Sequence, residues 1–231
     1  MVKARSQEKE LLDLGPGYYS AEEYLHCMKM LFRVNKLFGF FYSTVKTLKK
    51  FPATSSVLDI GCGGGLFLIH LSKYFPAMQL TGVDISSEAI RVAQQELAAR
   101  PKINSKVKFQ WQEKPQLDIP ENSVDLILTT LVCHHLSDEE LVDFLQNMLQ
   151  GSRFAVIIND LHRHRLAEWS YRCISPILFN NRLITHDGLI SIRRGFKRSE
   201  WQALLRKAGI QNYSIKWRFP FRWEIILWKG H

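Results

Sequence analysis

The sequence predicts an α/β fold, a doubly wound and mostly parallel sheet of seven strands whose last strand runs antiparallel. From residue 56 onward, short apolar runs alternate with amphipathic segments of helical period, the pattern of parallel strands joined by crossover helices. Near the carboxyl end, two strand-like runs flank Pro220, which predicts a closing hairpin. With 231 residues and 46% hydrophobic composition, the chain can fill one such core and a cap.

The elements follow one another in a regular order. Strands are expected at residues 56–60, 78–84, 107–111, 123–130 and 153–160, with helices at 66–74, 86–100 and 138–149 between them. Ser86 suits an N-cap, and Ser137 with Glu140 forms the S-x-x-E pattern of a capping box. Upstream, residues 20–51 repeat apolar side chains at spacings of three and four, which predicts one helix, or two broken near Gly39.

The chain is expected to form a single domain over residues 1–231. Its four parts are a helical cap (1–50), a cofactor-binding half (51–160), a lid insertion (161–198) and a C-terminal helix with a hairpin (199–231). The lid is placed where the regular pattern stops for nearly 40 residues, and Ser199 is the expected N-cap of the helix that follows.

Composition and charge restrict the class of protein. The chain has no run of 18 apolar residues and no apolar stretch typical of a secretory signal, so we expect neither a membrane span nor secretion. Four scattered cysteines without a C-x-x-C pair argue against a zinc site or disulfides and favour a reducing cytoplasm. The net charge is +9, with an acidic middle and basic flanks, which suits an anionic substrate, an anionic membrane surface or nucleic acid.

Residues 57–65 read VLDIGCGGG, a strand followed by four glycines in five positions. Such a turn lets a ligand approach exposed backbone amides. Dinucleotide-binding loops usually read G-x-G-x-x-G, but the sixth position here is Leu66, and Asp59 would repel a pyrophosphate. Asp84, 23 residues beyond Gly61 at the end of the second strand, suits the two hydroxyls of a ribose, as found in NAD and S-adenosylmethionine. The missing glycine and Asp59, which suits an ammonium group, favour S-adenosylmethionine.

Four stretches in this order, VLDIGCGGG, LTGVDIS, QWQEKPQLDIPENSVDLILTT and LVCHHLSD, resemble the class I S-adenosylmethionine-dependent methyltransferases. The resemblance covers roughly residues 55–160 and implies their Rossmann-like fold, with S-adenosylmethionine as cofactor and S-adenosylhomocysteine as product. Glu113 stands where the family often has aspartate. The implied cofactor-binding residues are Asp59 before the loop, Gly61, Cys62 and Gly63 along the methionine portion, Asp84 at the ribose, Ile85 against adenine, Glu113 near the adenine amino group and Thr129 beside the methyl donor.

Candidate catalytic residues follow the fourth and fifth strands, because ligands bind outside the carboxyl ends of parallel strands. His135 lies where the family's small-molecule branch, including quinone-pathway C-methyltransferases, often has histidine; alternatively, it orders the turn before the next helix. Asp160 and His162 follow the fifth strand and would face the acceptor, where a histidine of near-neutral pKa could accept a phenolic proton. The alternative for these two residues is a solvated basic loop.

The leading hypothesis is a cytoplasmic methyltransferase acting on an oxygen or carbon of a small aromatic or lipid-like acceptor. The cap and lid are rich in large aromatic residues, which suits an apolar pocket, and the arginines of the lid suit an anionic group or membrane headgroups. After the fourth strand, TTLVCHH replaces both the Pro-Pro-aromatic string of base-methylating enzymes and the acidic ligands of catechol methyltransferases, so no metal is expected. The NDL-x-R tract followed by GFKRSEW also resembles a bacterial subgroup associated with aromatic polyketide-type pathways.

Three other hypotheses stay open. The basic flanks suit an RNA or protein methyltransferase, although nucleic acid is a less expected partner because the chain shows no added RNA-binding module. The intact glycine loop and Asp84 argue against a degenerate fold that serves only as a binding module, and an NAD-dependent oxidoreductase is the least favoured class. The basic cap would also allow peripheral contact with a membrane.

Overall fold

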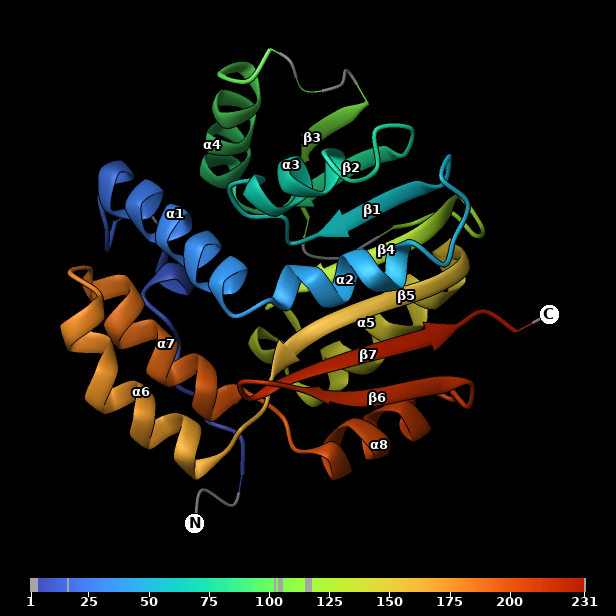
Figure 1. The fold of residues 1–231 in the computed structure, drawn as a ribbon. Helices are drawn as coiled ribbons and strands as arrows, with labels where there is room; N and C mark the ends of the chain where they lie inside the picture. Colours follow the sequence, from blue (N-terminus) through green and yellow to red (C-terminus); the bar gives the residue numbers. More distant parts are fainter. Residues whose placement is uncertain (1–3, 16, 102, 104–105, 115–117, 231) are drawn as a thin grey trace.

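The fold is built on one seven-stranded sheet in the order β3-β2-β1-β4-β5-β7-β6 (Figure 1). The strands are β1 (Ser56–Ile60), β2 (Gln79–Asp84), β3 (Val107–Trp111), β4 (Val124–Thr130), β5 (Ser152–Leu161), β6 (Tyr213–Arg218) and β7 (Arg222–Trp228). They come from a computed structural model that describes residues 4–15, 17–101, 103, 106–114 and 118–230. Strands β1 to β5 pair in parallel, whereas β7 runs antiparallel to β5 and β6. The predicted fold class is therefore confirmed.

Helices cover both faces of this sheet (Figure 1). They are α1 (Ala21–Leu37), α2 (Phe40–Leu48), α3 (Leu66–Ser72), α4 (Ser87–Ala98), α5 (Asp138–Gly151), α6 (Arg165–Leu178), α7 (Arg182–Arg194) and α8 (Arg198–Lys207), with short 3-10 turns η1 (Leu12–Leu14) and η2 (Cys133–His135). Helices α2, α3 and α4 pack with one face of the sheet in one core cluster, and α5 and α8 pack with the other face in a second. This arrangement is the doubly wound architecture.

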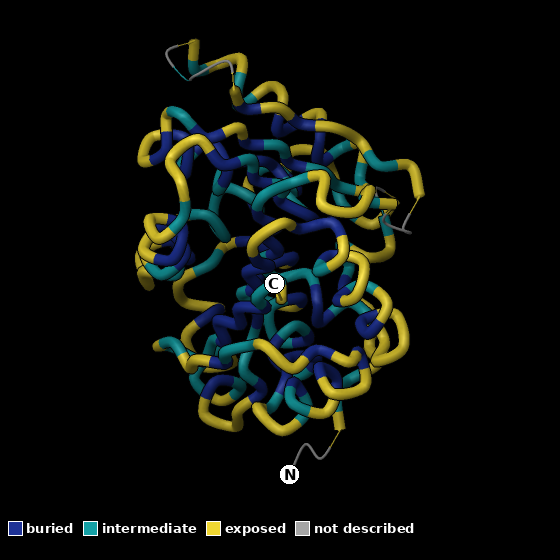
Figure 2. Tube along the Cα trace, turned by 90° about the vertical axis from the view of Figure 1, so that its right-hand side faces the viewer, coloured by how far each residue is buried: buried dark blue, intermediate teal, exposed yellow. Residues whose placement is uncertain are grey.

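The central strands are apolar on both sides, because both of their faces are covered. Leu126, Ile127 and Leu128 of β4 alternate between the two core clusters and are at most 1% exposed. Figure 2 shows buried segments running through the middle of the molecule, with exposed segments around the rim. The carboxyl ends of β1, β2, β4 and β5 meet at one edge of this core, which is where a ligand is expected.

Local sequence signals set several boundaries as predicted. The cap consists of two helices broken at Gly39, whose φ of 70° lies in the left-handed region. Ser86 caps α4, and Ser137 with Glu140 forms the capping box of α5. Helix α8, in contrast, begins at Arg198 rather than after Ser199, because the Glu200 carboxylate accepts the Lys197 N–H (2.7 Å) and closes the first turn earlier.

The lid insertion is a helical hairpin of α6 and α7, whereas the sequence pattern predicted only irregular structure there. The two helices approach closely at Gly188: a Cβ added to it would lie 2.1 Å from the Tyr171 hydroxyl oxygen. Pro176 inside α6 and the glycine inside α7 weaken the helical signal of the sequence, and packing between the two helices compensates for both.

Residues 4–15, which we call the N-terminal strap, cross from the lid hairpin toward the end of β4. The strap is held by backbone and side-chain contacts to α7 and η2. Among the residues that the structure describes, no helix has the length and hydropathy needed to cross a membrane. Residues 115–117, inside one of the stretches that resemble methyltransferases, lie outside the described residues.

Candidate active site

The glycine loop links β1 to α3 at the carboxyl edge of the sheet. Gly61 has a φ of 74°, and a Cβ added there would lie 2.3 Å from Val132 in the segment after β4. Gly65 has a φ of 70°, and its Cβ would lie 2.5 Å from the Phe109 ring. These two glycines are therefore required by backbone conformation and close packing. Gly63 also has a positive φ, but the space around it is open enough for an ordinary contact with Met28 of α1 at 3.6 Å.

Asp84 ends β2 beside this loop. Its Oδ2 accepts the Gly63 N–H (2.8 Å) and its Oδ1 accepts the Ser86 N–H (2.9 Å). Burial raises the pKa of Asp84, and these two amide bonds offset only part of that effect. Each oxygen keeps acceptor capacity for a further hydroxyl donor. The next side chain, Ile85, is 61% exposed and offers an apolar surface beside the carboxylate.

Asp59 lies one residue before the end of β1 and is fully buried. Its Oδ1 has no hydrogen-bond partner among the described residues. Burial, reinforced by the charge of Asp84, raises the pKa of Asp59 to about 8. An unpaired buried carboxyl group is costly, so a positively charged ligand group nearby would stabilise its ionised form.

These features fit S-adenosylmethionine. The molecule carries a ribose diol, which Asp84 can accept, and an ammonium and a sulfonium charge, which the buried Asp59 carboxyl group can balance. The backbone of the glycine loop lies between Asp59 and Asp84 in the sequence and can contact the ligand. Helix α1 covers this loop, with Met28 lying against Gly63 and Gly64.

Three other predicted cofactor residues differ in their exposure. Cys62 is half-buried, and its thiol donates weakly to the Gly63 carbonyl (3.7 Å). Glu113 is exposed just after β3. Thr129 is fully buried, and its hydroxyl donates to the Ile60 carbonyl (3.0 Å). The Thr129 side chain is therefore engaged within the sheet. Among the described residues, the hydroxyl of the next residue, Thr130, has no hydrogen-bond partner.

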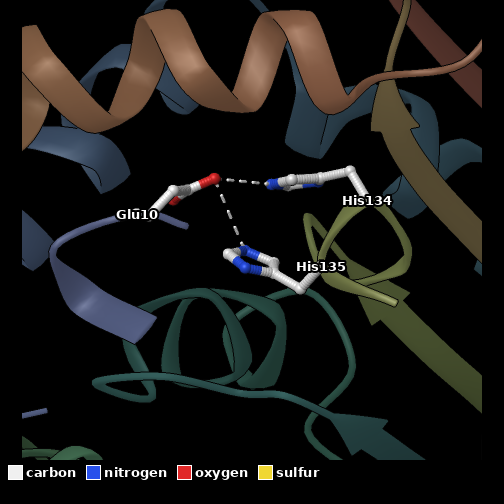
Figure 3. A group of neighbouring side chains, drawn as sticks. All are labelled: Glu10, His134 and His135. Carbon is white, nitrogen blue, oxygen red and sulfur yellow. Dashed lines mark ion pairs between the residues drawn. The ribbon is translucent and has the colours of Figure 1, made fainter. Parts of the chain in front are cut away.

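Asp160 was expected to face the acceptor. Its side chain is instead fully buried against His134. Its Oδ1 lies 2.7 Å from His134 Nδ1, and its Oδ2 accepts the His134 N–H (3.2 Å). On the other side of the ring, His134 Nε2 lies 3.5 Å from Glu10 Oε1 of the N-terminal strap (Figure 3). Burial by itself would lower the pKa of His134, but Asp160 and Glu10 outweigh it and raise the pKa to about 9. His134 is thus a cation between two buried carboxylates.

His135 lies beside this cluster and reaches the same strap. Its Nδ1 lies 2.8 Å from Asp13 Oδ1, and its Nε2 lies 4.0 Å from Glu10 Oε1 (Figure 3). The side chain is 29% exposed, so a ligand can reach the ring. Donor atoms of Glu10, His134 and His135 lie within 4.8 Å of one another, but a protonated His134 accounts for this spacing and we assign no metal to it.

Further contacts that the sequence did not predict hold the strap over the site. Arg194 of α7 donates to the carbonyls of His134 (2.9 Å) and His135 (2.7 Å), and it pairs with Asp13 (2.7 Å). Asp187 of the same helix accepts the backbone N–H groups of Leu11 and Leu12 at 2.9 and 3.1 Å. These partners lie far apart in the chain, and no local motif marks them.

His162 lacks the near-neutral pKa that was expected. Burial and the neighbouring His164 and Arg163 lower its pKa to about 4. Its Nδ1 accepts the Trp217 indole N–H (3.2 Å), and its ring packs 4.7 Å from Trp223. A neutral ring of such low pKa is a weak base, which argues against proton transfer by His162.

The sheet order, the glycine loop and Asp84 define a nucleotide-binding α/β fold of the Rossmann-like methyltransferase type. Residues 57–153 match the family model described as a methyltransferase domain. This part of the chain is therefore a methyltransferase domain, and the predicted resemblance to the class I S-adenosylmethionine-dependent enzymes is confirmed.

Several known proteins are similar to the chain. Ajmaline N-methyltransferase of Rauvolfia serpentina is 33% identical over 122 residues, covering 52% of this chain and 40% of the relative. An uncharacterised Bacillus subtilis methyltransferase is 27% identical over 183 residues, covering 77% and 66%. The chain thus spans less than two thirds of the length of these relatives. Human N-acetylserotonin methyltransferase in complex with S-adenosylmethionine has a similar fold, with a TM-score of 0.65 at 19% identity over 93% of this chain and 58% of that one.

Proposed function

We propose that the protein is an S-adenosylmethionine-dependent methyltransferase that acts on a small-molecule acceptor. The observation that carries this proposal is the pairing of Asp84 with the glycine loop through the Gly63 N–H (2.8 Å), next to the unpaired Asp59 carboxyl oxygen. The methyltransferase family match over residues 57–153 supports the same activity.

The proposed cofactor-binding residues have distinct tasks. Asp84 accepts the ribose hydroxyls, Ile85 packs against the adenine, and Glu113 accepts a hydrogen bond from the adenine amino group. The backbone of Gly61, Cys62 and Gly63 lines the methionine portion, Asp59 balances its positive charge, and Thr129 supports the loop from within the sheet. The bound cofactor supplies an electrophilic methyl group on its sulfonium, and the chain's own contribution is to position donor and acceptor.

His135 is the proposed base where the acceptor must lose a proton. It is partly exposed, and its Nδ1 lies 2.8 Å from Asp13 Oδ1, whereas its Nε2, 4.0 Å from Glu10 Oε1, is the nitrogen proposed to face the acceptor. Asp160 acts through His134 as a positioning residue, because its contacts fix the η2 turn that carries His135. His162 contributes to the shape of this edge rather than to proton transfer.

The proposed acceptor is aromatic or lipid-like. Ajmaline N-methyltransferase, similar over half of this chain, is named for a small-molecule acceptor, which supports a small molecule as the acceptor. Exposed apolar side chains also gather where α1 meets α2 and at the turn of the β6–β7 hairpin: Leu37, Phe38, Tyr42, Trp217 and Phe219. Arg222 joins the two places by contacting Asn35 and Phe40.

This apolar surface, together with the exposed cations Arg33, Lys36 and Lys46 of the cap, is also the proposed site of peripheral membrane contact. The cytoplasm is the proposed compartment, because the four cysteines are free thiols and reduced cysteines suit a reducing environment.

The test of the activity begins with the cofactor. Titration calorimetry should show that the wild-type protein binds S-adenosylmethionine and that Asp84→Asn loses about 100-fold in affinity, because two charge-assisted hydrogen bonds to the ribose are weakened. Asp143→Asn, an exposed change of equal charge on α5, should bind like the wild type. Absence of binding by the wild type would refute the proposal. A panel of phenols, quinones and fatty acids with labelled methyl donor then identifies the acceptor class.

A further inference from the structure

A small hollow lies between the cap and the carboxyl ends of three strands, next to the proposed donor site. It opens to solvent, and its cavity volume of about 10 Å³ has room for one water-sized group. Its walls are Asn35, Phe40 and Ser43 from the cap, Thr130 and Asn159 from β4 and β5, and Arg218 and Arg222 from the hairpin.

Strand register places this hollow beside the glycine loop. Ile60 pairs with Thr129, so Thr130 is level with Gly61 and about one strand spacing, roughly 5 Å, across the sheet. Thr130 pairs with Asn159 in turn. Leu126 and Leu128 belong to the core cluster on the face of α2 and α3, and alternation along β4 places Thr130 on that same face.

Arg222 is a cation at the wall of this hollow that makes no close ion pair with a described residue. Its Nη2 donates to Asn35 Oδ1 (3.1 Å), and its guanidinium carbon lies 4.4 Å from the centre of the Phe40 ring. Within the described part of the chain, no carboxylate oxygen lies within 4.0 Å of Arg222, whereas Arg218 beside it pairs with Glu224 at 2.8 Å. Burial lowers the pKa of Arg222 to about 10, and Asp160 and Tyr171 offset this only in part. The guanidinium therefore remains charged, at a cost that an anion would relieve.

A second polar group in the wall lacks a partner. The Thr130 hydroxyl is buried and has no hydrogen-bond partner among the described residues. A hydroxyl in this position can donate to an oxygen that enters the hollow. The Phe40 ring and the nearby apolar rim suit the carbon skeleton to which such an oxygen is attached.

We propose that this hollow binds an oxyanion group of the methyl acceptor, a carboxylate or a phosphate, with Arg222 as its counter-ion and the Thr130 hydroxyl as a hydrogen-bond donor. This assignment rests on the proposed function, because it names the acceptor class of the same site. It implies that the acceptor is an apolar skeleton with one anionic end, which enters beside the donor and is fixed by Arg222 while another atom receives the methyl group.

The test uses small probes and does not depend on methyl transfer. Protein-detected NMR titrations with benzoate, its neutral counterpart benzamide, and phenyl phosphate should show that at least one of the anions binds about tenfold more tightly than benzamide and shifts the Thr130 and Asn159 amides. Preference for benzoate identifies a carboxylate, and preference for phenyl phosphate identifies a phosphate. Equal binding of benzamide and both anions would overturn the assignment.

Variants locate the charge. Arg222→Gln should reduce anion affinity about tenfold and leave benzamide unchanged, whereas Arg206→Gln, an exposed change of equal charge on α8, should have no effect. Arg222→Lys should keep part of the affinity for the anions, and Thr130→Val should lose part of it. These two variants test the proposal if Arg222→Gln folds poorly. Unaltered anion binding in Arg222→Gln and Thr130→Val would refute the role of the hollow. Binding of S-adenosylhomocysteine, measured on each variant, separates this result from failure of the cofactor site.

Discussion

The Asp59 carboxyl group is buried at the end of β1 with one oxygen unpaired, and its pKa is raised to about 8, by burial first and by Asp84 second. At pH 7 it is therefore mostly protonated in the ligand-free protein. A ligand that brings positive charge to it lowers the pKa and displaces the proton.

We expect S-adenosylmethionine binding at pH 7 to release nearly one more proton per protein molecule from the wild type than from Asp59→Asn. Calorimetry in buffers of different ionisation enthalpy measures this difference and corrects for protons taken up by the ligand itself. Affinity of the wild type should also increase up to about pH 8 relative to the variant. The same proton balance in both proteins would show that Asp59 does not face the ligand's charge.

Single residues near the glycine loop could be predicted because their signals are local. Gly61 and Gly65 follow a buried strand directly, and Asp84 ends the next strand, so spacing alone indicates that they meet. Arg222 could not be assigned in this way. Its role depends on the antiparallel placement of β7 beside β5 and on a cap helix nearly 190 residues away, at Asn35 (sequence separation 187).

Asp160 and His162 have other surroundings than the sequence led us to expect, for a related reason. Their position after the fifth strand was right, but alternation along an extended chain turns Asp160 away from the face that carries Asn159. Asp160 then meets His134, and His162 meets Trp217 and Trp223. A motif fixes where a residue lies along the chain, whereas the contacts made in the folded protein decide whether its side chain can reach a ligand.

Among the elements, the N-terminal strap and the lid hairpin were the least predictable. The strap has little regular structure beyond the η1 turn, and it is ordered by distant partners such as Arg194 and Asp187. In the lid, the helical signal of α6 and α7 is interrupted by Pro176 and Gly188, yet mutual packing stabilises both helices. The strands and the capped helices were predictable because each contains its own apolar period or cap.

The strap is linked to the sheet by a titratable group. His134 lies between Glu10 of the strap and Asp160 of β5, and the pair raises its pKa to about 9 against the burial that would lower it. Arg194 and Arg5 contact the carbonyl of the same histidine, and His135 pairs with Asp13 next to it. The folded state therefore holds the His134 proton more tightly than the unfolded chain does.

This gives stability a definite pH dependence. The contribution of His134 is fully present below about pH 6.5, the ordinary pKa of histidine, and is lost as pH rises through 9. Asp59, whose pKa is raised to about 8, lowers the stability of the wild type in the same direction, and Asp59→Asn removes this contribution. In Asp59→Asn we therefore expect the free energy of unfolding to fall by about 3 kcal/mol across this range, or Tm by about 9 °C, because of His134. Thermal melts from pH 6 to 9.5 measure it. His186→Gln, an exposed change on α7, should keep the same profile, whereas stability that is constant or rises with pH would contradict the assignment.

The whole molecule has an uneven charge distribution that matches its architecture. Residues 51–161, which form most of the sheet, contain eight basic and thirteen acidic residues, whereas residues 162–198 around the lid contain eight basic and two acidic. The cap adds exposed cations beside the apolar rim of the proposed acceptor hollow. A surface that combines exposed cations with large apolar groups suits the interface of an anionic membrane.

We therefore expect the protein to sediment with vesicles that contain anionic lipid, to remain unbound with neutral phosphatidylcholine vesicles, and to dissociate as salt is raised. The double change Leu37→Ser with Phe219→Ser should reduce vesicle binding about tenfold, because two exposed apolar groups at the rim are removed. Ile177→Ser removes an equally exposed apolar group from α6, away from the rim, and should bind like the wild type. Loss of binding in Ile177→Ser but not in the double variant would place the membrane contact on the lid, and indifference to lipid charge would remove the basis for a membrane role.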